Sequence, residues 1–322
     1  MGKIDRRSFL AGCVAASIVG CVPQSMPFEP QLLWGRRGFS DGRFIKPRAI
    51  AIDESDQLYI VDTTGRIQVF DADGNFLRGW ATPQTENGRP TGLAFQTSKQ
   101  ASDGQSKLLV ADTHYYRVLA YSPDGELLEE NTIGGTSGRG PGEFAFVTDV
   151  VTDANGCFYV GEYNDSDRIQ KFDPDGKFIC QWGGTGEKPG QFFRPQSLVV
   201  AENTLWIADA CNHRIQRYDL AVEKPQLIDV VGASGSQRGQ LAYPYGLVVP
   251  PDSTDFIVVE YKNARVQRFA YDGTCLGVWG GPGLQPGQLN QPWGIVLDSQ
   301  NRVHVLDSNN HRVQRIAMNQ IA

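Results

Sequence analysis

Two glutamate–tyrosine pairs are the residues in this chain that best suit ligand chemistry. Glu162-Tyr163 and Glu260-Tyr261 stand where similar segments elsewhere in the chain carry aspartate. A carboxylate beside an aromatic ring can bind the polar groups of a ligand such as a sugar, while the ring supplies an apolar wall. With Asp149 as a third oxygen donor, the same carboxylates could instead hold a hard cation such as calcium.

Two further aromatic residues occupy equivalent positions in the chain. Tyr245 and Trp293 each follow a proline that opens a repeated segment. We expect them to join Tyr163, Tyr261 and Asp149 in an aromatic mouth edged by carboxylates. Packing between neighbouring repeats is the alternative role for these rings.

Three histidines offer a second kind of site. His114, His213 and His311 fall in corresponding loops of alternate repeats, and three histidines form a ligand set that catalytic zinc uses. His213 and His311 also belong to a repeated Asn-His-Arg motif, and His114 lies two positions out of register with them. The pattern therefore also fits residues that serve the architecture.

The elements that position these residues follow from a motif that occurs six times. It reads Arg, an apolar residue, usually Gln, any residue, then an aromatic or large apolar residue. The copies begin at Arg66, Arg117, Arg168, Arg214, Arg265 and Arg312. A period of about 40–50 residues is typical of propeller blades, so the motif indicates architecture.

An acidic residue precedes each of these arginines by four to six positions. The acids are Asp62, Asp112, Glu162, Asp209, Glu260 and Asp307. We expect the four aspartates to form hydrogen-bonded ion pairs with the arginines on adjacent strands. The two glutamates, one methylene longer, are the copies that we expect to line the channel mouth.

Each repeat predicts four short antiparallel strands. In the fourth repeat, alternating runs at 197–200, 204–208 and 214–218 are separated by polar turns. An Asp-Gly pair, as at Gly176, then favours a tight hairpin into a fourth run. Six such units predict an all-β fold, a six-bladed β-propeller of four-stranded antiparallel blades that forms one domain over residues 31–322.

The last repeat has its first three strands, but the chain ends before a fourth. A segment that resembles the missing strand, QLLWGRRG, occupies residues 31–38. We therefore expect the N-terminal strand to complete the last blade and to close the ring.

The repeated motif resembles the NHL repeat, which is named for Asn-His-Leu. The segments DACNHRIQRYD at 209–219 and DSNNHRVQRI at 307–316 are close to its core, and the glycine-rich lead-ins GGTGEKPGQFFRP and GGPGLQPGQLNQP also match. The resemblance covers residues 31–316. It implies the propeller fold but not a function, because function depends on the site rather than on the fold.

The first thirty residues predict export. Arg6 and Arg7 precede an apolar run at 9–20, which is too short to span a membrane and fits a signal peptide. Arg-Arg-x-Phe-Leu resembles the twin-arginine signal, and Ile-Val-Gly-Cys resembles a bacterial lipobox. We expect a signal peptide over 1–21, lipidation of Cys21 and a tether over 22–30. Secretion without a lipid is the alternative.

Composition argues against two other kinds of site. The chain has 36 acidic and 30 basic residues and a net charge of −6, so it lacks the basic footprint of a nucleic-acid-binding protein. Cys157, Cys180, Cys211 and Cys275 show neither zinc-site nor disulfide spacing, and we expect them to be reduced and mostly buried.

These features lead to one main hypothesis. The protein is expected to be an exported periplasmic or cell-surface lipoprotein, a monomeric propeller that binds a protein partner or a small polar ligand through its channel face. Its contact with the membrane is through the lipid anchor alone. The alternative is a hydrolase or lyase that uses calcium or zinc in the central channel.

Overall fold

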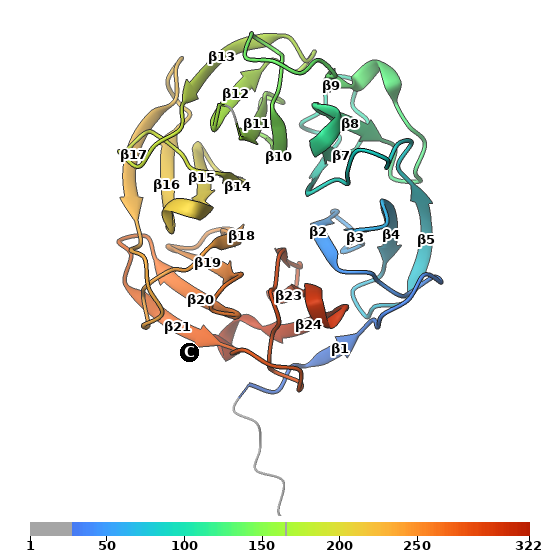
Figure 1. The fold of residues 1–322 in the computed structure, drawn as a ribbon, viewed down its shortest axis with the longest axis vertical. Helices are drawn as coiled ribbons and strands as arrows, with labels where there is room; N and C mark the ends of the chain where they lie inside the picture. Colours follow the sequence, from blue (N-terminus) through green and yellow to red (C-terminus); the bar gives the residue numbers. More distant parts are fainter. Residues whose placement is uncertain (1–27, 165) are drawn as a thin grey trace, which may run out of the picture.

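A computed structural model describes residues 28–164 and 166–322 of the chain. Six sheets form a ring around a central axis (Figure 1). Each sheet has four strands, and the paired strands within each sheet are antiparallel. The predicted fold class, an all-β six-bladed propeller, is confirmed. Arg6, Arg7, Cys21 and most of the predicted tether lie outside the described residues.

The blades follow one another along the chain, and the first strand of each lies innermost (Figure 1). Blade 1 contains β2 (Pro47–Ile52), β3 (Leu58–Asp62), β4 (Arg66–Phe70) and β5 (Phe76–Ala81). Blade 2 contains β6 (Gly92–Gln96), β7 (Lys107–Asp112), β8 (Arg117–Tyr121) and β9 (Ile133–Gly134). Blade 3 contains β10 (Phe146–Thr152), β11 (Phe158–Tyr163), β12 (Arg168–Phe172) and β13 (Phe178–Gly183).

The second half of the ring repeats this order. Blade 4 contains β14 (Pro195–Ala201), β15 (Thr204–Asp209), β16 (Arg214–Asp219) and β17 (Gln226–Val231). Blade 5 contains β18 (Pro244–Val248), β19 (Asp255–Glu260), β20 (Arg265–Ala270) and β21 (Cys275–Trp279). Blade 6 contains β22 (Ile295–Leu297), β23 (Arg302–Asp307), β24 (Arg312–Ala317) and β1 (Leu32–Trp34). Short 3-10 turns are η1 (Thr113–Tyr115), η2 (Glu129–Asn131), η3 (Ala210–Asn212), η4 (Ser308–Asn310) and η5 (Met318–Gln320).

The N-terminal strand closes the ring, as the sequence predicts. β1 pairs with β24 in antiparallel register, with Leu32 opposite Arg315 and Trp34 opposite Val313. The Trp34 ring packs against Phe70 of blade 1, with 4.7 Å between the ring centroids. Strand pairing and side-chain packing therefore join blade 6 to blade 1, and they close the ring.

The core consists of six layers, each lying between two neighbouring blades. One layer packs Tyr59 and Val61 of blade 1 against Leu108 and Val110 of blade 2, and the other five join the remaining pairs of neighbours in the same way. The alternation of strand residues produces this arrangement, because successive side chains point to opposite faces of a sheet and both faces are covered. The innermost strands are thus held rigidly around the axis.

The predicted Asp-Gly hairpins are present before the outer strands. Gly176 has φ 76°, and its N–H bonds to the Asp173 carbonyl at 2.9 Å. The equivalent Gly74, Gly125 and Gly273 also have positive φ. Within the described part of the chain, no helix is long and apolar enough to cross a membrane.

Candidate functional site

The six repeated acid–arginine pairs tie each blade together. Asp209 of β15 is fully buried and accepts a bond from Arg214 of β16 at 2.8 Å. The Arg214 guanidinium also reaches the carbonyl oxygen of Gln191 in the loop that enters the blade, at 2.8 Å. The other pairs are Asp62–Arg66, Asp112–Arg117, Glu162–Arg168, Glu260–Arg265 and Asp307–Arg312. The expected ion pairs are confirmed.

Glu162 and Glu260 lie in this same set of ties rather than in the channel wall. Both carboxylates are fully buried. Glu260 accepts bonds from Arg265 at 2.5 Å, from Asn263 at 2.6 Å and from the Ala242 N–H at 2.8 Å. Glu162 pairs with Arg168 and accepts the N–H of Ala145. The extra methylene of glutamate is taken up inside the blade, so neither carboxylate turns toward the mouth.

Two of the predicted histidines join neighbouring blades. The Nδ1 of His213 in blade 4 accepts the N–H of Tyr243 at the entry of blade 5, at 3.1 Å. The Nδ1 of His311 in blade 6 accepts the N–H of Lys46 at the entry of blade 1, at 2.9 Å. His114 instead packs its ring 4.9 Å from that of Phe146. The consensus histidines therefore act as connections between blades.

Possible metal ligands do not gather anywhere in residues 28–164 and 166–322. No group of three or more His, Cys, Asp or Glu side chains in these ranges could hold a metal ion. Glu162 and Glu260 are each paired with an arginine of their own blade, whereas Asp149 accepts backbone N–H groups. The three carboxylates considered for calcium thus form no common site.

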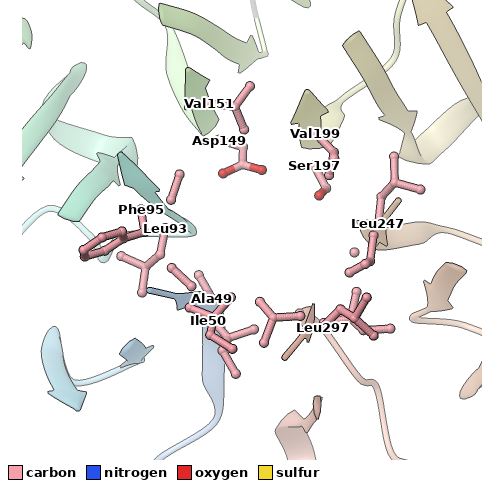
Figure 2. A pocket seen from close by; sticks show the side chains of 18 of the residues that line it. Ala49, Ile50, Leu93, Phe95, Asp149, Val151, Ser197, Val199, Leu247 and Leu297 are labelled. Atoms are coloured by element: carbon pink, nitrogen blue, oxygen red, sulfur yellow. The ribbon is translucent and has the colours of Figure 1, made fainter. Parts of the chain in front are cut away.

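A channel of about 570 Å³ runs along the ring axis between the innermost strands. Apolar side chains make up most of its wall, and Figure 2 shows Leu93, Phe95, Val151 and Leu297 around the opening. Four acidic residues line the end of the channel at which the inner strands finish: Asp53, Glu54, Asp56 and Asp298. Such a space suits a ligand whose body is apolar.

Six equivalent residues stand at the start of the inner strands, at the other end of the channel, and all of them except the buried Thr148 line it: Arg48, Thr91, Thr148, Gln196, Tyr245 and Trp293. In blades 1, 3, 4 and 5 this residue is an extra one in its strand, since the pairing register skips it. Such bulges redirect a side chain from the regular alternation of the strand. We call these six residues the mouth ring.

The mouth combines aromatic rings with arginines. Tyr245 lies 4.7 Å from Tyr261 and 4.9 Å from Trp293, between ring centroids. The Arg194 guanidinium lies 4.7 Å from the Tyr163 centroid and 5.4 Å from that of Tyr245. The structure therefore gathers all four predicted aromatic residues, and it adds Arg194, which sequence reasoning missed.

Arg48 is a cation with no acidic partner among residues 28–164 and 166–322. Its guanidinium lies 5.5 Å from the Trp293 centroid, and it makes no hydrogen bond or ion pair with any residue that the structure describes. Burial, then the charges of Arg194 and Arg89, lower the pKa of Arg48. A half-buried guanidinium beside two others favours an anion at this mouth.

Asp149 lies one residue deeper than the mouth ring and is the ionisable group of the apolar channel wall. Its side chain directs both oxygens toward the opening, with Ser197 of the next strand beside it (Figure 2). Oδ1 accepts the N–H of Val150 at 3.0 Å, and Oδ2 accepts the N–H of Leu198 at 2.9 Å. Burial raises the pKa of Asp149 to about 7 despite these bonds.

Gly92 makes room for this carboxylate. A Cβ atom on Gly92 would lie 2.6 Å from Asp149 Oδ1 and 2.5 Å from the Thr148 carbonyl oxygen. Asp149, Tyr245 and Trp293 thus line the channel as predicted ligand residues, while Tyr163 and Tyr261 flank its mouth.

Comparisons with known proteins agree with this architecture. A family model described as NHL repeat matches residues 289–316, and another described as 6-bladed beta-propeller matches residues 149–246. Mouse peptidyl-glycine alpha-amidating monooxygenase is 30% identical over 197 residues, which are 57% of this chain and 18% of that protein. Human NHL repeat-containing protein 3 is 29% identical over 174 residues, 51% of this chain and 49% of that protein.

The chain spans less than half the length of these two curated relatives. Among solved structures, virginiamycin B lyase from Staphylococcus aureus superposes with a TM-score of 0.56 at 10% identity, over 90% of this chain and 95% of that one. At this identity the likeness concerns the fold alone. The chain is a six-bladed β-propeller, and its segment 289–316 matches the NHL repeat.

Proposed function

We propose that this propeller is a binding module whose channel takes a small ligand with an anionic group and an apolar body. The observation that carries the proposal is Arg48, a half-buried cation at the mouth, near Arg89 and Arg194, with no acidic partner among the described residues. A ligand carboxylate would supply the missing counter-charge and accept paired guanidinium bonds. The apolar wall below the mouth would cover the rest of the ligand.

The charges at the two ends of the channel give the ligand a direction. Arginines surround the mouth, while Glu54 and Asp56 line the opposite end. An anion is attracted to the first and repelled by the second, so it should enter by the arginine end and keep its charged group there. The aromatic rings of Tyr245 and Trp293 would contact the adjoining apolar part of the ligand.

Octanoate is a suitable probe for this function, and calorimetry measures its binding. We expect Arg48→Gln to weaken octanoate binding by about tenfold or more, because a hydrogen-bonded charge pair contributes about 1.5–3 kcal/mol. Lys177→Gln, which removes an exposed cation near the outer hairpin of blade 3, should leave binding unchanged. Equal affinity in native protein and Arg48→Gln would contradict the proposed mouth site.

The proposed setting of this module is the outer side of a bacterial membrane, to which a lipid on Cys21 would hold it. Support comes from the twin-arginine-like Arg6-Arg7 and the lipobox-like segment that ends at Cys21. Cell fractionation tests the anchor: Cys21→Ser should move the protein from the membrane fraction to the soluble fraction. A variant that stays with the membrane would rule out the lipid.

A further inference from the structure

Asp149 differs from the six buried acids that pair with the motif arginines. The six acids of the repeated acid–arginine pairs each have an arginine partner, whereas Asp149 forms no ion pair with any described residue. It accepts backbone N–H groups, one on each oxygen, and a hydrogen bond with the Ser197 side chain also acts on it. Because a carboxylate can accept about four hydrogen bonds, Asp149 keeps acceptor capacity on the channel side.

The propeller fold does not require an acid at this position. The equivalent residues of the other five blades are Ala49, Gly92, Ser197, Gly246 and Gly294. These side chains are small or absent, so they leave a chamber directly below the mouth ring. Asp149 is the one ionisable side chain at this level of the channel, which argues that it serves a ligand rather than the ring.

The chamber and the mouth lie close together along the axis. Asp149 directly follows Thr148, the member of the mouth ring in β10, so it lies about 3.3 Å deeper along the strand. Arg194 stands on the same side of the channel as Asp149, since Asp149 Oδ2 accepts the N–H of Leu198 in the strand that follows Arg194. An anion held by Arg194 would therefore have the Asp149 carboxylate below it, with Arg48 of blade 1 as the second cation. A single ligand can satisfy both only if a cationic or donor group lies next to its anion.

We propose that the channel binds an α-amino carboxylate with an apolar side chain. The ligand carboxylate contacts Arg48 and Arg194, the ammonium group donates to Asp149, and the side chain extends along the apolar wall past Leu93 and Val151. This inference rests on the proposed function and deepens it by naming the class of ligand. Asp149 then selects an amino acid over a plain acid of the same length.

The surroundings of Asp149 make this contact depend on pH. Its strand neighbours at this level, Gly92 on β6 and Ser197 on β14, carry no charge, and on β11 the nearby Glu162 is paired with Arg168. Across the mouth stand Arg48, Arg194 and Tyr245. Since the carboxyl of Asp149 titrates near pH 7, its hold on an ammonium group should strengthen from pH 6 to pH 8.

Three probes with the same eight-carbon chain test the inference by calorimetry: 2-aminooctanoate, octanoate and octylamine. We expect 2-aminooctanoate to bind most tightly at pH 8, and its affinity to rise by up to about tenfold from pH 6 to pH 8 as Asp149 ionises. Asp149→Asn should abolish this rise and leave octanoate binding intact. Asp124→Asn, which alters an exposed carboxylate, should behave like the native protein.

The outcomes separate the two proposals. If octanoate binds but 2-aminooctanoate binds no more tightly at pH 8, or keeps its pH dependence in Asp149→Asn, the amino-acid site is wrong and the anion site stands. If neither acid binds, both the proposed function and this inference are overturned. Loss of 2-aminooctanoate affinity in Asp149→Asn, with octanoate unaffected, supports the two-point site.

Discussion

Replacing Asp149 with asparagine should remove a pH dependence of stability that the native protein carries. Burial raises the pKa of this carboxyl from 3.8 to about 7 in the folded state. Between these values the folded protein holds a proton that the unfolded chain has released, so the free energy of unfolding falls as pH rises. The contribution is fully present below pH 3.8 and is lost as the pH passes about 7.

The size of the effect follows from the shift in pKa. Each pH unit over which the folded state alone is protonated lowers the free energy of unfolding by about 1.4 kcal/mol. From pH 5 to pH 8 the native protein should therefore lose about 3 kcal/mol through Asp149, because its proton leaves the folded state near pH 7. Asp149→Asn has no such proton and should lose none of this amount.

Urea denaturation at pH 5, 6, 7 and 8 measures the effect in both proteins. Burial also raises the pKa of acids in the repeated acid–arginine pairs, among them Asp209 and Asp307. These acids are present in the native protein and in Asp149→Asn, so their contributions cancel when the two free energies of unfolding are subtracted. Asp124→Asn is the control, since that side chain is 91% exposed, and it should follow the native protein. If Asp149→Asn shows the same loss of stability as the native protein, the carboxyl titrates as an exposed group and the reasoning fails.

Three further substitutions test other parts of the structure by denaturant unfolding. Gly92→Ala should lower the free energy of unfolding by about 1–3 kcal/mol, because the added Cβ would press on Asp149. Gly281→Ala is the control and should change little, since open space surrounds Gly281. Equal effects of the two substitutions would contradict the contact with Asp149. Glu260→Ala should cost about 3–5 kcal/mol by leaving the partly buried Arg265 without its partner, and a loss below 1 kcal/mol would show that the pair contributes little. Trp34→Ala should cost about 3–5 kcal/mol, because it removes the ring that packs β1 against blade 1. Phe39→Ala should cost almost nothing, since Phe39 is 74% exposed. Similar values for the two would argue against closure by β1.

The repeat made the fold and the ties predictable from sequence. The motif that occurs six times specifies the six blades, and the acid that precedes each motif arginine specifies an ion pair between neighbouring strands. Blades and ion pairs are predictable because each depends on local strand geometry. The glutamate copies were expected at the mouth, but side-chain length alone cannot tell which way a carboxylate turns. Glu260 instead accepts a loop N–H and its motif arginine, as Asp209 does in blade 4.

Arg194 could not be predicted in the same way. A residue before proline is expected to be extended, yet Arg194 has φ 62°, and the carboxylate of Asp167 in the preceding blade accepts its N–H at 2.8 Å. This contact between blades turns its side chain toward Tyr163 and Tyr245. Lys46, Tyr243 and Gln291 share this backbone conformation before their prolines, so the sequence signal lies in the repeated position rather than in any single residue.

A ring of equivalent blades can present an unequal site because the inner strands are free to differ. The ties and the layers between blades use the same residue types around the ring, and they fix the backbone without reference to the channel. At the level below the mouth ring, five blades supply small side chains and blade 3 supplies Asp149. That carboxylate is destabilising at neutral pH, since its folded-state pKa is raised. A feature that costs stability, and that five equivalent positions do without, is best explained by a ligand that carries a matching positive charge.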